Sequence, residues 1–227
     1  MIETALKISI AQLLFLSLYV LLLRRETFFE WNRVYLIFTA IISLIVPFVQ
    51  FNWINQNIIS EASYTINEII VFANIKNQNA ITIPAKETLT QFDFKIEHFY
   101  LIGCIVFTIL FIRKLQKLNS LKSKCIRSKK NKIIEYKIPN STVAFSFLNC
   151  LFIGEKVKPN MYEVIINHEL VHIKEKHSYD LILFEILKIA LWFSPFIYLY
   201  QYLISEIHEF IADREMDKND AHETLLQ

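Results

Sequence analysis

Three long apolar runs dominate the first half of the chain. They cover residues 5–23, 34–51 and 98–112, and polar segments separate them. An α-helix needs about twenty apolar residues to cross a bilayer, so we predict three transmembrane helices. The first run is too long for the core of a signal peptide, and no small-residue cleavage site follows it. We therefore expect this first helix to be retained.

The charges between the runs predict how the helices are oriented. Arg24, Arg25 and Arg33 lie in the short loop after the first run, and basic loops stay in the cytoplasm. The amino terminus is then expected outside. Segment 52–97 is polar and has few basic residues, so we expect an extracytoplasmic loop that either senses a ligand or simply connects two helices.

A basic run follows the third apolar run and extends from Arg113 to Lys132. Directly after a transmembrane helix, such a run marks the cytoplasmic side and anchors the chain to anionic lipid. Nucleic-acid binding is the alternative, but the net charge of the chain is only +2. We therefore expect the lipid bilayer to be the partner of this segment, with no direct contact to nucleic acid.

Beyond the basic run, the pattern changes to that of a small α+β region. Residues 133–138 and 143–153 are predicted strands, with a turn at Pro139 between them. A helix should follow, with Asn160 as its N-cap and Glu163 completing a capping box. We expect this helix to be unbroken between residues 162 and 177. It is apolar on almost every side, which predicts burial.

Composition agrees with membrane segments and adds no further site. Hydrophobic residues make up 54% of the chain, and only two residues are glycine. This composition is richer in apolar residues than that of an ordinary soluble domain. Cys104, Cys125 and Cys150 form no spacing typical of a metal site. The sequence contains no glycine-rich phosphate loop.

The predicted helix contains the sequence His168-Glu169-Leu170-Val171-His172. Side chains four residues apart lie on one face of a helix, so His168 and His172 can bind a single Zn²⁺. Glu169 lies beside them and can reach a water on the metal, as a general base must. The motif predicts a zinc peptidase.

A catalytic zinc site needs a third protein ligand. Glu209 and Asp213 are also four residues apart, on a second predicted helix. Glu209 can complete the metal site, while Asp213 accepts the spare ring N–H of a ligand histidine. Glu206 and His208 are alternatives on the same helix, and we expect both of them to be exposed to solvent.

The apolar segment 181–204 separates the two halves of this site and is about as long as a transmembrane helix. A single crossing would put the two halves on opposite sides of the membrane. We therefore predict two half-length helices that form a hairpin in or against the inner leaflet. The break falls at Ser194-Pro195, because proline interrupts a helix. Glu185 and Lys188 should then point toward protein.

These motifs together resemble a known family. The H-E-L-V-H sequence, Trp192-Phe193-Ser194-Pro195 and the E-x-x-x-D pattern are similar to those of BlaR/MecR-type antirepressor metallopeptidases, and the resemblance covers about residues 1–215, including 141–147. It implies a membrane protein whose cytoplasmic gluzincin-like domain acts on a transcriptional repressor or on itself. The implied zinc ligands are His168, His172 and Glu209, and the implied general base is Glu169.

Some features of the family leave alternatives open. Family members often carry Asp where His177 stands and Asn where Ser194 stands, and neither position is a ligand. In gluzincin-like folds a strand at the position of 143–153 pairs with the substrate backbone, whereas an ordinary core hairpin is the alternative. His177, His208 and Arg214 are candidates for stabilising the oxyanion.

We therefore expect a mainly α membrane protein with three transmembrane helices, a cytoplasmic α+β gluzincin-like zinc peptidase domain and a membrane-associated helical hairpin. The expected boundaries are 1–51 for the transmembrane hairpin, 52–97 for the extracytoplasmic loop, 98–116 for the third transmembrane helix and 117–227 for the peptidase domain.

The expected function is signal-dependent proteolysis by a multi-pass zinc endopeptidase of the cell membrane. An HtpX-like or CaaX-protease-like peptidase would use the same ligand pattern, and it would cleave unfolded membrane proteins without an inducing signal. A sensor or scaffold without enzymatic activity is the third possibility, and a zinc assay on the purified protein distinguishes it from the other two.

Overall fold

A computed structural model describes residues 2–49, 96–130 and 133–225 of the chain. The chain divides into two units, of which the larger contains Met1–Pro47 and Lys95–Gln227. All the packing described below lies within this larger unit. The predicted extracytoplasmic loop 52–97 lies outside the described residues, except for its last two positions.

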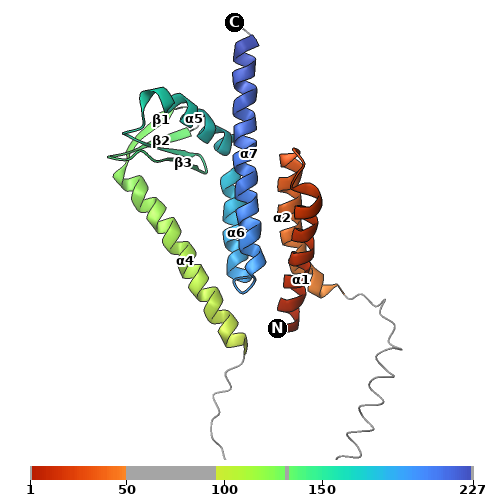
Figure 1. Cartoon of the computed structure of the whole chain (residues 1–227). Coiled ribbons are helices and arrows are strands. Elements are labelled where there is room, and N and C mark those ends of the chain that lie inside the picture. The colour runs from red at the N-terminus through yellow and green to blue at the C-terminus, as the bar shows by residue number, and fades with distance from the viewer. Residues whose placement is uncertain (1, 50–95, 131–132, 226–227) are drawn as a thin grey trace, which may run out of the picture. The chain divides into compact units, whose positions relative to one another are not determined.

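Three helices are long and apolar enough to cross a membrane, as predicted (Figure 1). Helix α1 (Ile2–Leu18) continues as the π-helical turn η1 (Tyr19–Leu23), and α2 (Phe29–Ile45) ends in the 3-10 turn η2 (Val46–Phe48). Helix α4 (Ile96–Lys124) extends twelve residues beyond the predicted apolar run 98–112. The first part of the basic run therefore lies on this helix.

A four-stranded sheet follows α4. Its strands are β1 (Ile126–Lys130), β2 (Ile133–Ile138), β3 (Ala144–Phe147) and β4 (Cys150–Gly154), in the order β1-β2-β4-β3. The β2 and β4 pair is parallel, and the other two pairs are antiparallel. Strand β3 is therefore an edge strand.

The prediction of a single strand over 143–153 was wrong. Leu148 adopts a left-handed conformation with φ of 53° and reverses the chain between β3 and β4. The part of the predicted basic run from Ile126 to Lys130 forms β1. The charges in this run had not indicated a strand. Leu118 and Leu121 of α4 pack against the buried cluster of the sheet, which contains Phe152. The end of the third long helix and the sheet therefore share a core.

Helix α5 spans Pro159–Lys174, and its predicted start and end were both wrong. The N-cap is Lys158 without a side-chain capping bond, and Pro159 occupies the first turn, which proline favours because that turn needs no N–H donor. The helix ends before Lys176, whose φ of 59° turns the chain into the next helix. The expected burial is also only partial, because Val164 is 56% exposed.

The predicted helical hairpin is present (Figure 1). Helix α6 (His177–Ala190) and helix α7 (Pro195–Leu225) pack against each other and are joined by residues 191–194. Segment 181–204 is therefore not one continuous helix. Glu185 points toward protein as predicted, since it accepts hydrogen bonds from Lys188 at 2.8 Å and from Lys114 at 2.9 Å.

Two polar contacts fix how far the hairpin extends along α1. Ser194 Oγ, at the turn, donates to Gln12 Oε1 at 2.6 Å, and Arg24 binds the Glu206 carboxylate at 3.3 Å. Gln12 and Arg24 are twelve residues apart, as are Ser194 and Glu206, so α1 and α7 run alongside each other in register over about 18 Å. The apolar core of a bilayer is about 30 Å thick. In a bilayer that α1 crosses, the hairpin would therefore extend to about half the depth of the bilayer core.

The core around the hairpin is continuous with the first two helices. Fully buried side chains from four helices contact one another, among them Leu36 of α2, Phe184 of α6 and Tyr200 of α7. Tyr200 also donates to Thr39 Oγ1 at 3.2 Å, and Gln12 Nε2 donates to Ser43 Oγ at 3.3 Å. These hydroxyl and amide groups satisfy one another inside the apolar core, as buried polar groups must.

This packing predicts the accessibility of introduced cysteines. In a chain whose three native cysteines are replaced, Lys176→Cys and Lys218→Cys should react with a membrane-impermeant thiol reagent from the same side, because both positions are exposed and the hairpin returns between them. Ser194→Cys should react poorly from either side, because Ser194 is fully buried. Labelling of the first two positions from opposite sides in intact cells would show that segment 181–204 crosses the membrane.

Candidate metal centre

Helices α5 and α7 bring three metal-binding side chains together. His168 Nε2 lies 3.2 Å from His172 Nε2 and 3.3 Å from Glu209 Oε2, and His172 Nε2 lies 3.8 Å from Glu209 Oε1. The two histidines lie one turn apart on α5, as their spacing predicts. Glu209 reaches them from α7, which packs on α5.

These distances fit a zinc site. Nitrogen and oxygen ligands lie about 2.0–2.2 Å from Zn²⁺ in a tetrahedral arrangement, so the ligand atoms are about 3.3 Å from each other. Two imidazoles and one carboxylate form a donor set that catalytic zinc uses. Among the described residues, His168, His172 and Glu209 form the group of three whose donor atoms can meet at one ion.

The remaining predicted residues surround this group. Glu169 lines a cavity of about 330 Å³ together with His172 and Glu209, and Phe145 of strand β3 also lines it. Asp213 lies one turn beyond Glu209, and its Oδ1 is 3.5 Å from His168 Nδ1. That is the ring nitrogen that faces away from Glu209, so Asp213 can orient His168, as the sequence predicted.

A second orienting group binds His172, and its role was not expected. His172 Nδ1 lies 2.7 Å from His177 Nδ1. The two residues are five positions apart, which is not a spacing of one helix face. They meet because the left-handed Lys176 separates α5 from α6 and turns the chain back.

A chain of polar contacts continues from His177 to helix α2. The His177 ring stacks on His208 with centroids 3.9 Å apart, and His208 Nε2 lies 2.9 Å from Asp180 Oδ2. Arg33 Nε donates to the same carboxylate oxygen at 2.6 Å, and Arg33 Nη2 donates to the Glu175 carbonyl at 2.9 Å. Arg33, Asp180, His208 and His177 therefore connect an apolar helix to a candidate zinc ligand.

The protonation states of His172 and His177 are suited to metal binding. Burial lowers the pKa of His172, and burial together with the neighbouring His208 and His172 lowers the pKa of His177 to about 2. Both rings are therefore neutral near pH 7, which is the form of histidine that binds metal. A histidine that binds metal through Nε2 carries its proton on Nδ1. With a metal ion on its Nε2, His172 would therefore donate this proton to His177 Nδ1.

The other sequence candidates lie elsewhere or differ from expectation. Glu206 pairs with Arg24 and takes no part in the cluster. His208 was expected at the surface, but it is 2% exposed, because the stacked ring of His177 and the carboxylate of Asp180 enclose it. Arg214 donates to Glu30 at 2.7 Å and does not line the cavity.

Comparison of the chain with known protein families and with curated proteins gave no match. The resemblance to the antirepressor peptidases and the gluzincin-like fold therefore stay predictions that rest on the motif residues.

The geometry predicts a graded effect of substitutions in α7 on zinc affinity. Glu209→Ala should remove most of the zinc binding, because it deletes a ligand, whereas Asp213→Ala should cost about ten- to a hundredfold, as loss of an orienting partner does. Glu206→Ala is the matched control on the same helix. It removes only the partly exposed pair with Arg24 and should cost less zinc affinity than Asp213→Ala. Competition with a zinc chelator measures all three, and a larger loss for Glu206→Ala than for Glu209→Ala would reassign the ligand.

The contact at His172 predicts a different pair of outcomes. His177→Phe keeps a ring that stacks on His208 but removes the acceptor for the His172 N–H, so zinc affinity should fall about ten- to a hundredfold. His177→Asp supplies a carboxylate acceptor and should restore most of the affinity. Equal losses in the two variants, measured by the same chelator competition, would mean that His177 acts only through packing.

Proposed function

We propose that this chain is a membrane-embedded zinc endopeptidase. The observation that carries the proposal is the approach of His168, His172 and Glu209 to within 3.2–3.8 Å, although the apolar segment 181–204 separates Glu209 from the two histidines in sequence. The match of this geometry to a sequence motif that specifies the same residues supports zinc binding. Glu169 in the adjoining cavity supports hydrolysis.

Different residues of the chain have different roles in the proposed reaction. When bound, zinc supplies Lewis acidity, which acidifies water and polarises the scissile carbonyl. The Glu169 carboxylate takes a proton from the attacking water as the new C–O bond forms. Glu169 then delivers this proton to the amide nitrogen as the C–N bond breaks, which gives an amine and a carboxylic acid. The acid passes its proton to the amine, so the final products are an ammonium group and a carboxylate. Asp213 and His177 hold the two ligand rings in orientation.

The edge strand offers a way to bind a peptide substrate. Among the described strands, β3 pairs with β4 alone, and Ala144, Phe145 and Ser146 of β3 line the cavity that contains Glu169. An extended peptide can add to such an edge through main-chain hydrogen bonds. This mode favours an unfolded or extended segment and reads little of its sequence.

The depth of the site favours substrates at the membrane surface. Glu206 pairs with Arg24 at the charged end of the first apolar helix, and Glu209 lies three residues farther along α7. The site is therefore about 4–5 Å farther from the apolar core of the membrane than the Arg24–Glu206 pair. The basic residues of the loop 24–33 orient this side to the cytoplasm. We infer that the substrate is a cytoplasmic protein, a transcriptional repressor or the chain itself, cleaved in response to a signal.

Substitution of the general base tests the proposal. Glu169→Gln should bind zinc normally but cleave at least about a hundredfold more slowly, because general-base assistance is lost while all three ligands remain. His172→Ala should lose both zinc and cleavage. The measurements are zinc content of the purified protein and hydrolysis of a quenched fluorescent peptide in lipid nanodiscs.

Two results would contradict this assignment. Loss of zinc from Glu169→Gln to the same extent as from His172→Ala would make Glu169 a ligand. Purified protein that binds no zinc at all would favour a sensor or scaffold without enzymatic activity.

A further inference from the structure

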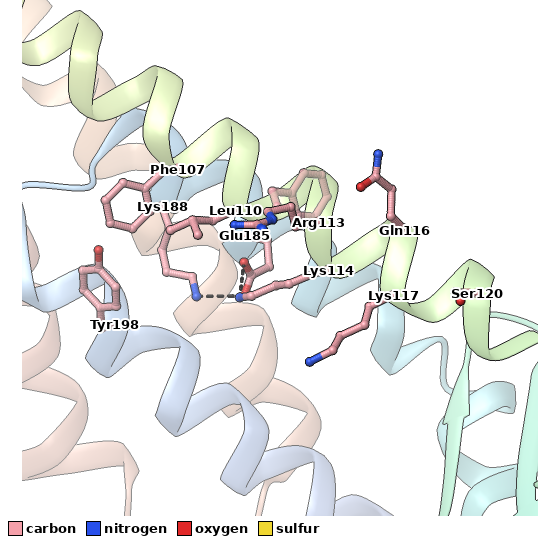
Figure 2. Close-up of a pocket in the computed structure, with 11 residues that line it drawn as sticks. Phe107, Leu110, Arg113, Lys114, Gln116, Lys117, Ser120, Glu185, Lys188 and Tyr198 are labelled. Atoms are coloured by element: carbon pink, nitrogen blue, oxygen red, sulfur yellow. Dashed lines mark hydrogen bonds and ion pairs between the residues drawn. The ribbon is translucent and has the colours of Figure 1, made fainter.

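A second cavity lies between helix α4 and the α6–α7 hairpin, away from the candidate metal centre (Figure 2). Its volume is about 720 Å³, which is within the range of pockets that hold small organic molecules. None of the residues assigned to zinc binding or hydrolysis lines it. The cavity therefore needs an explanation of its own.

One end of the cavity is cationic. Arg113, Lys114 and Lys117 approach it from α4, and Glu185 is the one acidic residue in the lining of the cavity. Lys188 of α6 lies between this end and the other, because it contacts both Glu185 and the Tyr198 ring. Lys114 and Lys188 both bind Glu185, at 2.9 Å and 2.8 Å. Arg113 and Lys117 form no ion pair within the described part of the chain. The cavity thus carries a net positive charge, and two of its cations are available to a ligand.

The other end of the cavity is apolar. Phe107 and Leu110 lie one to two turns back along α4, and the Tyr198 ring of α7 closes the same end (Figure 2). Lys188 Nζ lies 5.6 Å from the centre of that ring. Polarity therefore changes along the cavity from aromatic and aliphatic side chains to cations over about two turns of helix.

The change from apolar to cationic lining occurs at a position along α4 that matches a membrane interface. The apolar run of α4 ends at Ile112, and Arg113 is the first cation after it. Cations at the end of a transmembrane helix lie at the level of the lipid headgroups, and basic pockets between such helices bind anionic headgroups. Phe107 and Leu110 then lie at the level of the acyl chains.

We propose that this cavity binds one anionic glycerophospholipid, with its phosphate at Arg113 and Lys117 and an acyl chain along Phe107 and Leu110. A free phosphate ion would use only the cationic end and would leave the apolar wall exposed. The proposal rests on the membrane placement of α4 but not on peptidase activity.

A lipid in this position would join two parts of the molecule. Helix α4 continues into the sheet core through Leu118 and Leu121, and the sheet carries the edge strand of the candidate active site. The hairpin on the other side of the cavity carries Glu209 on α7. Lipid binding therefore stabilises the position of the sheet relative to the zinc ligand.

Native mass spectrometry of the detergent-solubilised full chain tests the proposal. Glu169→Gln protein is used so that proteolysis has no influence on the result. The protein is titrated with phosphatidylglycerol or phosphatidylcholine, and we expect one phosphatidylglycerol to bind at least tenfold more tightly than phosphatidylcholine. Each cation near the membrane surface contributes roughly fivefold to the affinity for anionic lipid. Arg113→Gln with Lys117→Gln should therefore weaken binding of the first phosphatidylglycerol by about thirtyfold.

Controls separate this site from general attraction to a basic surface. Lys137→Gln with Lys156→Gln removes the same charge from exposed positions outside the cavity and should change the affinity less than twofold. Equal effects of the two double variants would overturn the proposal. Displacement of the lipid by millimolar inorganic phosphate would also overturn it, because the site would then be one for free phosphate.

Thermal unfolding of each variant, followed by circular dichroism, reports whether the fold is intact. Should Arg113→Gln with Lys117→Gln unfold at a clearly lower temperature, the single variant Lys117→Gln replaces it, with an expected loss of lipid affinity of about fivefold. Retention of full lipid affinity in that single variant would contradict the proposal. Because the readout is lipid binding, failure here leaves the zinc and peptidase assignments unaffected.

Discussion

The structure depends on one constraint, which is that α5 and α7 must meet although the apolar segment 181–204 separates their metal-binding side chains in sequence. Glu209 reaches His168 and His172 only if the chain that leaves α5 returns to the same level. The interruption at residues 191–194 makes this return possible, and Pro195 fixes where α7 begins. The rest of the fold holds this hairpin in place.

Polar contacts fix the hairpin at both of its ends, while apolar packing stabilises it between them. Ser194 binds Gln12 at the turn, and Arg33 binds Asp180 near the start of α6. The Arg33 and Asp180 side chains are only 18% and 12% exposed. Removing one member of a buried ion pair costs about 3–5 kcal/mol. The polar pairs therefore define the register of the hairpin against α1 and α2.

The features that the sequence predicts are those with a short-range signal. The three long apolar runs, the spacing of His168 and His172, the spacing of Glu209 and Asp213, and the break at Ser194-Pro195 each depend on residues within one or two helical turns. The hairpin was inferred by adding one long-range condition, which is that two ligands must share an ion. Its presence in the fold shows that such a condition can outweigh hydropathy alone.

The features that sequence reasoning missed depend on contacts between distant segments. No local pattern relates Arg33 to Asp180, which are 147 residues apart, or shows that His208 is buried under the ring of His177. The end of α5 was missed because the left-handed residue is a lysine, and glycine is the usual signal for that conformation. Strand β1 was missed because its lysines and arginine have the composition of an anchor rather than a strand.

The position of Arg33 makes the candidate metal centre dependent on the apolar helix α2. This side chain binds the Glu175 carbonyl in the turn after α5 and also the Asp180 carboxylate that holds His208. His208 in turn supports the ring of His177, which fixes His172 through its Nδ1 atom. A shift of α2 along its axis would therefore move the turn and the orienting histidine together. Through these contacts, the orientation of a candidate zinc ligand is coupled to the packing of a helix that is long and apolar enough to cross a membrane.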